Sequence, residues 1–312
     1  MIPRTAIVLL LTFAALRPNT NNVPLASAFT TPLVSSINVR IRHRSLLSLE
    51  ETTISSPTDN ATPINSTATP PNNVGIFNRP GKDPDRAGKV NQDAHFHLSC
   101  HVHNLTKSPP AAAKNVTFVG VMDGHGTKGH VVTTYLRERL PFHLAELSRS
   151  ALPPRDAHHY ESRYLPPTLF RDRLSSILAQ SFELSHDDAR HDPNVPAGRS
   201  GTTCVVAAHS PDTDELYVAN VGDSRAVLFC RRRRRDGGGE EWGVVPLSET
   251  TTTASRVEER RRIENGEGRI DGNGNVWYGP VGIAMTRALG DAVMLRAGVV
   301  PTPEVGRFGL RE

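Results

Sequence analysis

The segment Val119-Gly120-Val121-Met122-Asp123-Gly124-His125-Gly126 runs from a short apolar strand directly into a turn that carries an aspartate and a histidine. Its last two glycines allow backbone conformations and close approaches that a side chain would prevent. Carboxylate and carbonyl oxygens are the ligands that Mg²⁺ and Mn²⁺ prefer, and an imidazole beside them can move a proton. Taken alone, the pattern fits a metal or catalytic site and an ordinary turn equally well.

Strands and helices are predicted on both sides of this turn. Residues 94–103 alternate in type as a half-buried strand does, and 116–122 predict a second strand. Apolar residues at helical spacing predict helices over 128–147 and 169–189. We expect Pro141 to kink or split the first helix, because proline removes a backbone donor and its ring clashes with the preceding turn. In the second helix, the residues expected on the apolar side are Leu174, Ile177, Leu178, Phe182 and Leu184.

The second half of the sequence predicts short antiparallel strands. Alternating, β-branched segments separated by turn residues occur at 201–208, 215–221, 225–230 and 242–247. A short helix is expected at 256–265. Antiparallel hairpins with two helices inserted among them favour an α+β layered sandwich, with sheets inside and helices outside.

Composition and charge exclude other classes of protein. Hydrophobic residues make up 37% of the chain and the net charge is +4, but the basic residues gather at 1–49, 231–235 and 256–262. The arginine run lacks interleaved aromatic residues, so we expect no contact with nucleic acid. The three cysteines form no CxxC pair, which argues against a disulfide scaffold and for a reducing compartment.

The first 49 residues have the composition of a targeting region. They contain no acidic residue, and their apolar run at 6–16 has the length of a signal-peptide core and is too short to span a bilayer. Ala26-Ser27-Ala28-Phe29 contains a small-residue cleavage pattern, and 30–49 is rich in serine, threonine and arginine. The arrangement resembles the bipartite plastid presequence of diatoms and related algae. It implies a signal peptide at 1–28, a transit-peptide-like segment at 29–49 and a plastid location reached through the secretory pathway, with secretion or an endomembrane location as the alternative.

A disordered linker is predicted at 50–88, where Pro, Asn, Thr and Ser occur without a hydrophobic period. In the domain expected at 89–312, five motifs follow one another: NQDA at 91–94, DGHG at 123–126, GTT at 201–203, ANVGDSRAV at 219–227 and TRALGD at 286–291. Each motif is weak alone. The ordered set resembles the metal-dependent protein serine/threonine phosphatases, the PPM or type-2C family.

The resemblance implies an αββα sandwich of two antiparallel sheets flanked by helices, with two Mg²⁺ or Mn²⁺ ions at one end of the paired sheets. Asp123 matches the carboxylate that bridges both ions, and Gly124 matches the glycine whose carbonyl binds one of them. Asp93 matches an acidic residue that helps to fix a metal-bound water, and Gln92 occupies a position that is Glu in many members. Asp223 matches a ligand of a third, weaker metal site.

The same resemblance implies hydrolysis of phosphoserine and phosphothreonine in proteins by a two-metal-activated water. His125 matches the proposed general acid, and Lys89 lies near the family's basic phosphate-binding position. The implied partner is a phosphoprotein substrate; we expect no stable membrane span after processing and a monomer. Arg287 and Asp291 are expected to hold their loop together through an ion pair.

The sequence departs from the family's pattern after residue 305. The D-G-x-W-D and D-N segments, each of which supplies a metal-binding aspartate in the family, do not occur before Glu312. We therefore expect a C-terminally truncated phosphatase domain. The alternative is a catalytically inactive pseudophosphatase that acts as a binding or regulatory module.

Overall fold

The computed structural model of the chain describes residues 8–12, 38–41, 74–78, 90–102, 114–149, 172–211, 213–233, 238–249 and 256–310. The helices in these ranges are α1 (Gly129–Arg149), α2 (Arg173–His191), α3 (Val257–Glu264) and the 3₁₀ helix η3 (Ala292–Ala297). The strands are β1 (Val8–Thr12), β2 (Asn38–Ile41), β3 (Val74–Phe77), β4 (Asp93–Val102), β5 (Lys114–His125), β6 (Gly201–Thr202), β7 (Cys204–Ser210), β8 (Glu215–Val221), β9 (Arg225–Arg233), β10 (Glu240–Pro246), β11 (Arg269–Ile270), β12 (Val276–Tyr278), β13 (Val281–Ile283), β14 (Leu289–Gly290) and β15 (Glu304–Gly309).

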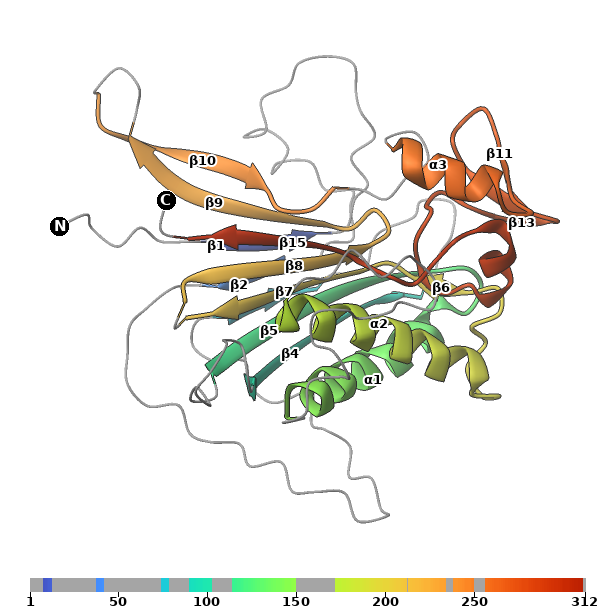
Figure 1. Cartoon of the computed structure of the whole chain (residues 1–312), viewed down its shortest axis with the longest axis horizontal. Coiled ribbons are helices and arrows are strands. Elements are labelled where there is room, and N and C mark those ends of the chain that lie inside the picture. Colours follow the sequence, from blue (N-terminus) through green and yellow to red (C-terminus); the bar gives the residue numbers. More distant parts are fainter. Residues whose placement is uncertain are drawn as a thin grey trace, which may run out of the picture.

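A seven-stranded sheet forms the centre of the domain (Figure 1). Its strand order is β14-β6-β5-β7-β8-β15, and β4 also pairs with β5. β4 has the alternating burial that its sequence predicts, with Ala94, Phe96 and Leu98 buried on one face. The sheet places the start of β4 beside the end of β5, because these two strands are antiparallel.

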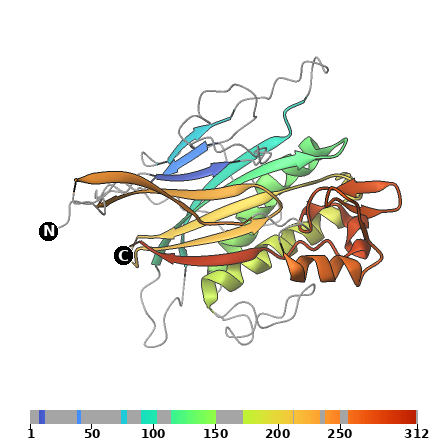
Figure 2. The same ribbon diagram turned by 90° about the horizontal axis from the view of Figure 1, so that it is seen from above.

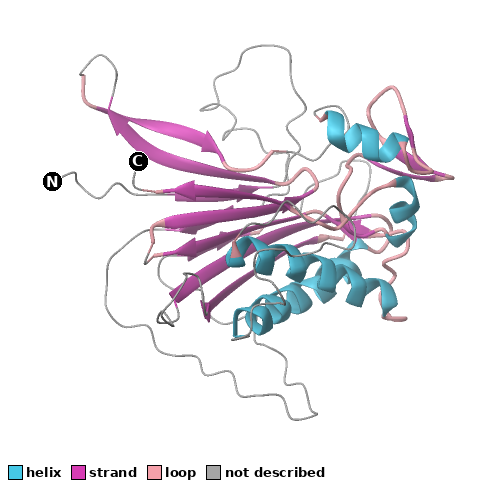
Figure 3. Ribbon diagram, in the orientation of Figure 1, coloured by secondary structure: helices cyan, strands magenta, loops and turns pink. Residues whose placement is uncertain are grey.

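Helices α1 and α2 cover one face of this sheet (Figure 3). They bury Leu136, Leu140 and Phe182 against side chains of β4, β5, β7 and β8. α1 is continuous through Pro141, so the prediction that the proline would split the helix is wrong. Pro141 is buried within the helix layer, and packing on both sides of it offsets the loss of one backbone hydrogen bond.

The opposite face of the sheet packs against a three-stranded sheet of order β1-β9-β10. Val119, Val121 and Val218 form the apolar surface between them, together with Leu228 and Leu247 from the smaller sheet and the segment after it. A third apolar cluster joins α3, β11–β13 and η3 at one end of the sheets (Figure 2). The predicted α+β class and antiparallel sheets are confirmed. Among the described residues, the two long helices α1 and α2 both lie on the same face of the central sheet.

Three observations bear on the predictions for individual segments. Leu184 is 37% exposed and does not join the apolar side of α2, because its place on the helix faces away from the sheet. β3 lies inside the range expected to be a disordered linker, so that prediction is wrong for residues 74–77, where Val74 is buried against the sheet. β1 lies inside the predicted signal-peptide core and pairs with β9.

The transit-peptide-like segment lies outside the described residues except for β2, and so does most of the predicted linker. Targeting therefore stays a prediction. No helix in the described part of the chain is long and apolar enough to cross a membrane.

Candidate metal and phosphate site

Two carboxylates lie directly opposite each other where β4 begins and β5 ends. Asp93 and Asp123 are cross-strand partners in the antiparallel pairing of these strands, so their side chains share one face of the sheet. Like charges in directly opposite positions repel each other, whereas a cation near both would make the arrangement favourable. In this register Phe96 of β4 and Met122 of β5 face the helices, and Asp93 and Asp123 lie on the other face of the sheet.

Glycines bring the backbone of the Asp123 turn against Gln92. The Gly124 N–H donates to the Gln92 carbonyl oxygen at 3.2 Å. A Cβ atom at Gly124 would lie 2.6 Å from that oxygen, and one at Gly129 would lie 2.1 Å from the Gln92 side-chain Oε1. Oε1 itself is buried and accepts no hydrogen bond from the residues that the structure describes. The turn therefore keeps an unsatisfied oxygen next to the two carboxylates.

His125 is held from behind by Asp291. The distance between His125 Nε2 and Asp291 Oδ2 is 2.5 Å, and the Asp291 side chain is 1% exposed. Burial by itself lowers the pKa of His125, but the charge and hydrogen bond of Asp291, with the charges of Asp123 and Asp223, raise the pKa above its ordinary value. A positively charged imidazole beside the carboxylates is therefore favoured at higher pH than in an exposed histidine.

Asp223 lies in the turn between β8 and β9, near the same end of the sheet. Burial raises the pKa of Asp223, and its backbone hydrogen bond and the charges of His125 and Arg225 offset this only in part. Thr203 connects this turn to the first strand pair. Its Oγ1 accepts from the Asp123 N–H at 3.2 Å and lies 2.6 Å from the Ser224 hydroxyl oxygen.

The structure thus places most of the predicted site residues at one end of the sheet. Asp93, Asp123, Gly124 and Gln92 adjoin one another, and His125 lies close enough to Asp123 and Asp223 for their charges to act on it. Lys89 lies outside the described residues. No group of three or more His, Cys, Asp or Glu side chains in the described ranges is arranged to hold a metal ion.

The donor set nevertheless fits Mg²⁺ or Mn²⁺. The pair of carboxylates, the backbone carbonyl of Gly124 and the unsatisfied Gln92 Oε1 are all hard oxygen ligands. Mg²⁺ is commonly held by one or two carboxylates, with waters completing its shell. The residues described here would supply that minimum.

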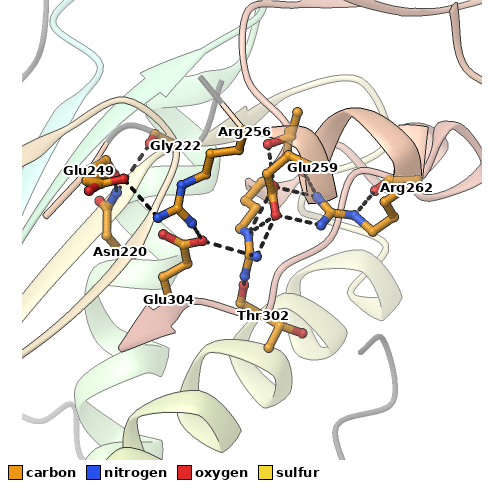
Figure 4. Close-up of polar contacts among 11 residues, drawn as sticks. Asn220, Gly222, Glu249, Arg256, Glu259, Arg262, Thr302 and Glu304 are labelled. Atoms are coloured by element: carbon orange, nitrogen blue, oxygen red, sulfur yellow. Dashed lines mark hydrogen bonds and ion pairs between the residues drawn. The ribbon is translucent and has the colours of Figure 1, made fainter. Parts of the chain in front are cut away.

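The predicted ion pair between Arg287 and Asp291 is wrong. Arg287 binds Glu259 instead, with Nη2 at 2.6 Å from Oε1, and donates from Nη1 to the Thr302 carbonyl at 2.8 Å. Figure 4 shows Glu259 receiving a second guanidinium from Arg262. Asp291 points the other way because its backbone is left-handed, with φ of 47°, and its carboxylate meets His125.

A cavity of about 340 Å³ lies beside this ionic network and away from Asp123. Asn220, Arg256, Arg287 and Glu304 line it, and Arg256 bridges Glu249 and Glu304 (Figure 4). Sequence reasoning did not find Asp291, Thr203 or Glu259 as supports of the site. The TRALGD and GTT motifs contain two of them, but no local pattern gives their partners.

Comparison with known proteins places the chain among phosphatases. A family model described as "Protein phosphatase 2C" matches residues 85–311. "Probable protein phosphatase 2C 64" of Oryza sativa subsp. japonica is 31% identical over 202 residues, which cover 62% of this chain and 42% of the relative. "Protein phosphatase 1L" of Bos taurus is 33% identical over 195 residues, which cover 61% of this chain and 46% of the relative.

A solved serine-threonine phosphatase 2C from Toxoplasma gondii is 15% identical, with a TM-score of 0.44, over 69% of this chain and 73% of that one. The chain spans about half the length of the curated relatives it matches. The match to the family model extends over well more than half of the chain and includes every motif at the Asp123 end of the sheet. This chain belongs to the protein phosphatase 2C family.

Proposed function

We propose that this chain hydrolyses phosphoserine and phosphothreonine esters of proteins with the help of two Mg²⁺ or Mn²⁺ ions, and that a third ion binds weakly at Asp223. The observation that carries the proposal is the opposition of Asp93 and Asp123 beside His125. A divalent cation is the ligand that relieves the repulsion between these carboxylates, and the phosphate of the substrate would be attracted to the same cation.

The metals, when bound, activate water and neutralise charge on the phosphoryl group. Hydrolysis joins a water oxygen to phosphorus, releases a proton of that water to solvent and breaks the bond from phosphorus to the serine or threonine oxygen. His125 supplies the proton that this leaving oxygen needs. Before a cation binds, the charge and hydrogen bond of Asp291 hold the pKa of His125 above its ordinary value, although burial alone would lower it.

The residues around the turn have positioning tasks. Gln92 and Gly124 are held together by a backbone hydrogen bond, so the Gly124 carbonyl and the Gln92 side chain approach the carboxylates as one unit. Lys89 is proposed to bind the phosphate as a point charge. The partner is a phosphoprotein, and the active form is proposed to be a monomer.

The same geometry also suggests a second function. Two carboxylates, without a third acidic or histidine ligand gathered around them in the described ranges, make a weak metal site. A chain that binds metal or phosphoprotein without turning over would act as a pseudophosphatase, a binding or regulatory module.

Metal binding and turnover separate these functions. The full chain is titrated with Mn²⁺ while its thermal unfolding is followed, and Asp123→Asn is compared with Asp188→Asn, a carboxylate between α1 and α2. Metal at 100 times its dissociation constant should add about 2.7 kcal/mol of stability to the native chain. We expect that gain in the parent and in Asp188→Asn and its loss in Asp123→Asn.

Hydrolysis of a phosphothreonine peptide by the parent, abolished in Asp123→Asn, would support the phosphatase. Metal stabilisation without hydrolysis would favour the binding module. The absence of any Mn²⁺ effect on the parent would refute the phosphatase and the metal-binding form of the module.

For the N-terminal region we propose delivery to the plastid. The support is the acid-free composition of residues 1–49 and the Ala-Ser-Ala-Phe sequence at 26–29. A fluorescent reporter fused after Leu49 should enter the plastid of a diatom. Its appearance in the culture medium would show secretion instead.

A further inference from the structure

We propose that Thr203 is a positioning residue: its side chain connects the turn that carries Asp123 to the turn that carries Asp223, and so fixes the spacing of the groups that would hold the metal ions. The proposal rests on the proposed function, because it concerns the ligands of those ions. Thr203 lies 80 residues after Asp123 and 21 residues before Ser224 in the sequence. The GTT motif that contains it received no role in the chemistry from the sequence.

The first contact holds the backbone of Asp123 through two hydrogen bonds. β5 pairs with β7 up to Val121 and with β6 from Gly124 onward, and Asp123 lies between these two pairings. The Thr203 N–H donates to the Asp123 carbonyl oxygen at 3.0 Å, and the Asp123 N–H donates to Thr203 Oγ1 at 3.2 Å. The Thr203 carbonyl oxygen accepts from the Thr202 hydroxyl at 2.8 Å. Both main-chain polar groups of Asp123 are thus held by residue 203, so the placement of the Asp123 carboxylate depends on this residue.

The second contact holds the turn around Asp223. The Thr203 hydroxyl oxygen lies 2.6 Å from the Ser224 hydroxyl oxygen. On the other side of Asp223, a Cβ atom at Gly222 would lie 2.6 Å from the Thr203 methyl carbon, and Gly222 has φ of 93°. The residues before and after Asp223 therefore both meet the Thr203 side chain, one at its methyl group and the other at its hydroxyl group.

Burial and branching make this side chain a rigid connection. Thr203 is 1% exposed and Ser224 is 0% exposed. A β-branched side chain has few rotamers, and here both branches are engaged. A hydroxyl group can accept one hydrogen bond and share another, as the Thr203 hydroxyl does with the Asp123 N–H and with Ser224. Without that hydroxyl, the two turns would lose a group that both of them contact.

The connection matters because the two turns carry different candidate ligands. Asp123 faces Asp93 across the strand pair, whereas Asp223 lies in the turn between β8 and β9. Mg²⁺ demands near-ideal positions of its oxygen ligands. Residues that orient metal ligands from behind change metal affinity by about 10–100-fold when they are removed. Thr203 would therefore influence metal affinity at both turns without contacting a metal.

Calorimetric titration of the full chain with Mn²⁺ tests this role, with Asp223→Asn identifying the weaker site by its loss. Thr203→Val removes the hydroxyl group and keeps the methyl group, whereas Thr203→Ser keeps the hydroxyl group. We expect Thr203→Val to raise the Mn²⁺ dissociation constants at both turns at least about 10-fold, and Thr203→Ser to restore them to within about 3-fold of the parent.

Ser181→Ala separates positioning from a general loss of stability. Ser181 is 0% exposed, and its hydroxyl donates to the Ile177 carbonyl oxygen at 2.7 Å within α2. Urea unfolding without metal should show a loss for Ser181→Ala as it does for Thr203→Val, whereas Mn²⁺ affinity should fall only in Thr203→Val. An affinity of Thr203→Val within about 3-fold of the parent, or an equal fall in Ser181→Ala, would overturn the positioning role.

Ser224→Ala decides the question if Thr203→Val does not fold. It keeps the hydrogen bonds between Thr203 and Asp123, so it should weaken Mn²⁺ binding at Asp223 and leave the dissociation constant at Asp123 within about 3-fold of the parent. Unchanged affinity at both turns would overturn the proposal. A parent chain that binds no Mn²⁺ would refute the proposed function itself, whereas a parent that binds Mn²⁺ with the same affinity as its variants would refute only the role of Thr203.

Discussion

Replacing Glu259 with glutamine should destabilise the domain by about 3–5 kcal/mol at pH 7, because it removes the main counter-ion of the buried Arg287, whose other carboxylate contact, to Glu304, is longer at 3.4 Å. Glu259 is 1% exposed. Its Oε1 accepts from Arg262 and Arg287 at 2.7 and 2.6 Å, and its Oε2 accepts from Arg262 at 2.7 Å and from the Thr286 hydroxyl at 2.5 Å. Glutamine keeps one acceptor oxygen and turns an amide toward the guanidinium groups.

The loss is large against a total stability of about 5–15 kcal/mol. Burial alone would raise the pKa of Glu259, but the hydrogen bonds and charges of Arg262 and Arg287 hold the pKa well below its ordinary value. A depressed carboxyl pKa contributes stability above the unfolded-state pKa, roughly 4.3, and this contribution is lost as pH falls toward the folded-state pKa. The gap between the parent and Glu259→Gln should therefore narrow below about pH 4.

Urea denaturation followed by tryptophan fluorescence measures this effect, because Trp277 lies in the β12 strand that packs in the same end cluster as α3. Glu264→Gln is the control on the same helix. Glu264 pairs with Arg260 at the surface, with both side chains 53% exposed, and such pairs contribute about 0.5 kcal/mol or less. A loss below 1 kcal/mol for Glu259→Gln, or equal losses for the two variants, would refute the reasoning.

Three further predictions follow from packing and burial. Gly129→Ala should weaken Mn²⁺ binding in a calorimetric titration, because its Cβ would lie 2.1 Å from Gln92 Oε1 and push that oxygen away. His186 is 1% exposed, and burial is the main reason that its pKa is lowered to about 4. The fold accommodates the neutral ring, so the free energy of unfolding should fall by about 3 kcal/mol as the pH falls from about 6.5, the pKa of an exposed histidine, to 4. His186→Gln should flatten that part of a pH–stability curve. Phe182→Ala should cost about 3–5 kcal/mol in urea melts, whereas Leu184→Lys should change stability by less than about 0.5 kcal/mol.

The fold class and the position of the metal ligands follow from local patterns. Alternation in β4 predicts that Phe96 lies on the buried face and Asp93 on the other, and the pairing with β5 puts Asp93 against Asp123. Helical spacing predicts which side of α2 packs, but the prediction that Leu184 belongs to that side was wrong, because Leu184 is 37% exposed. The predicted split at Pro141 was wrong because the prediction considered the lost hydrogen bond and the clash of the ring but not the packing of the surrounding helix.

Partners distant in sequence could not be predicted. Arg287 and Asp291 are four residues apart and oppositely charged, so an ion pair was the simplest expectation. The left-handed backbone at Asp291 sends the two side chains to different places: Arg287 to α3 and Asp291 to β5. The conformation depends on Ser200 and Gly201, about ninety residues earlier in the chain, and no pattern within the motif records it.

The ionic network around Glu259 and the site around Asp123 differ in how far their buried polar atoms are hydrogen-bonded. At Glu259 both carboxylate oxygens and every guanidinium nitrogen of Arg262 and Arg287 take part in hydrogen bonds, which makes that network a rigid support. At the Asp123 end, Gln92 Oε1, His125 Nδ1 and Asp291 Oδ1 are buried and have no hydrogen-bond partner within the part of the chain that the structure describes. Each such atom costs the folded chain free energy unless something else supplies the hydrogen bond or the charge. The unsatisfied atoms at the Asp123 end lie where the proposed metal ligands gather, so a cation and the phosphate it attracts are the partners that we propose for them.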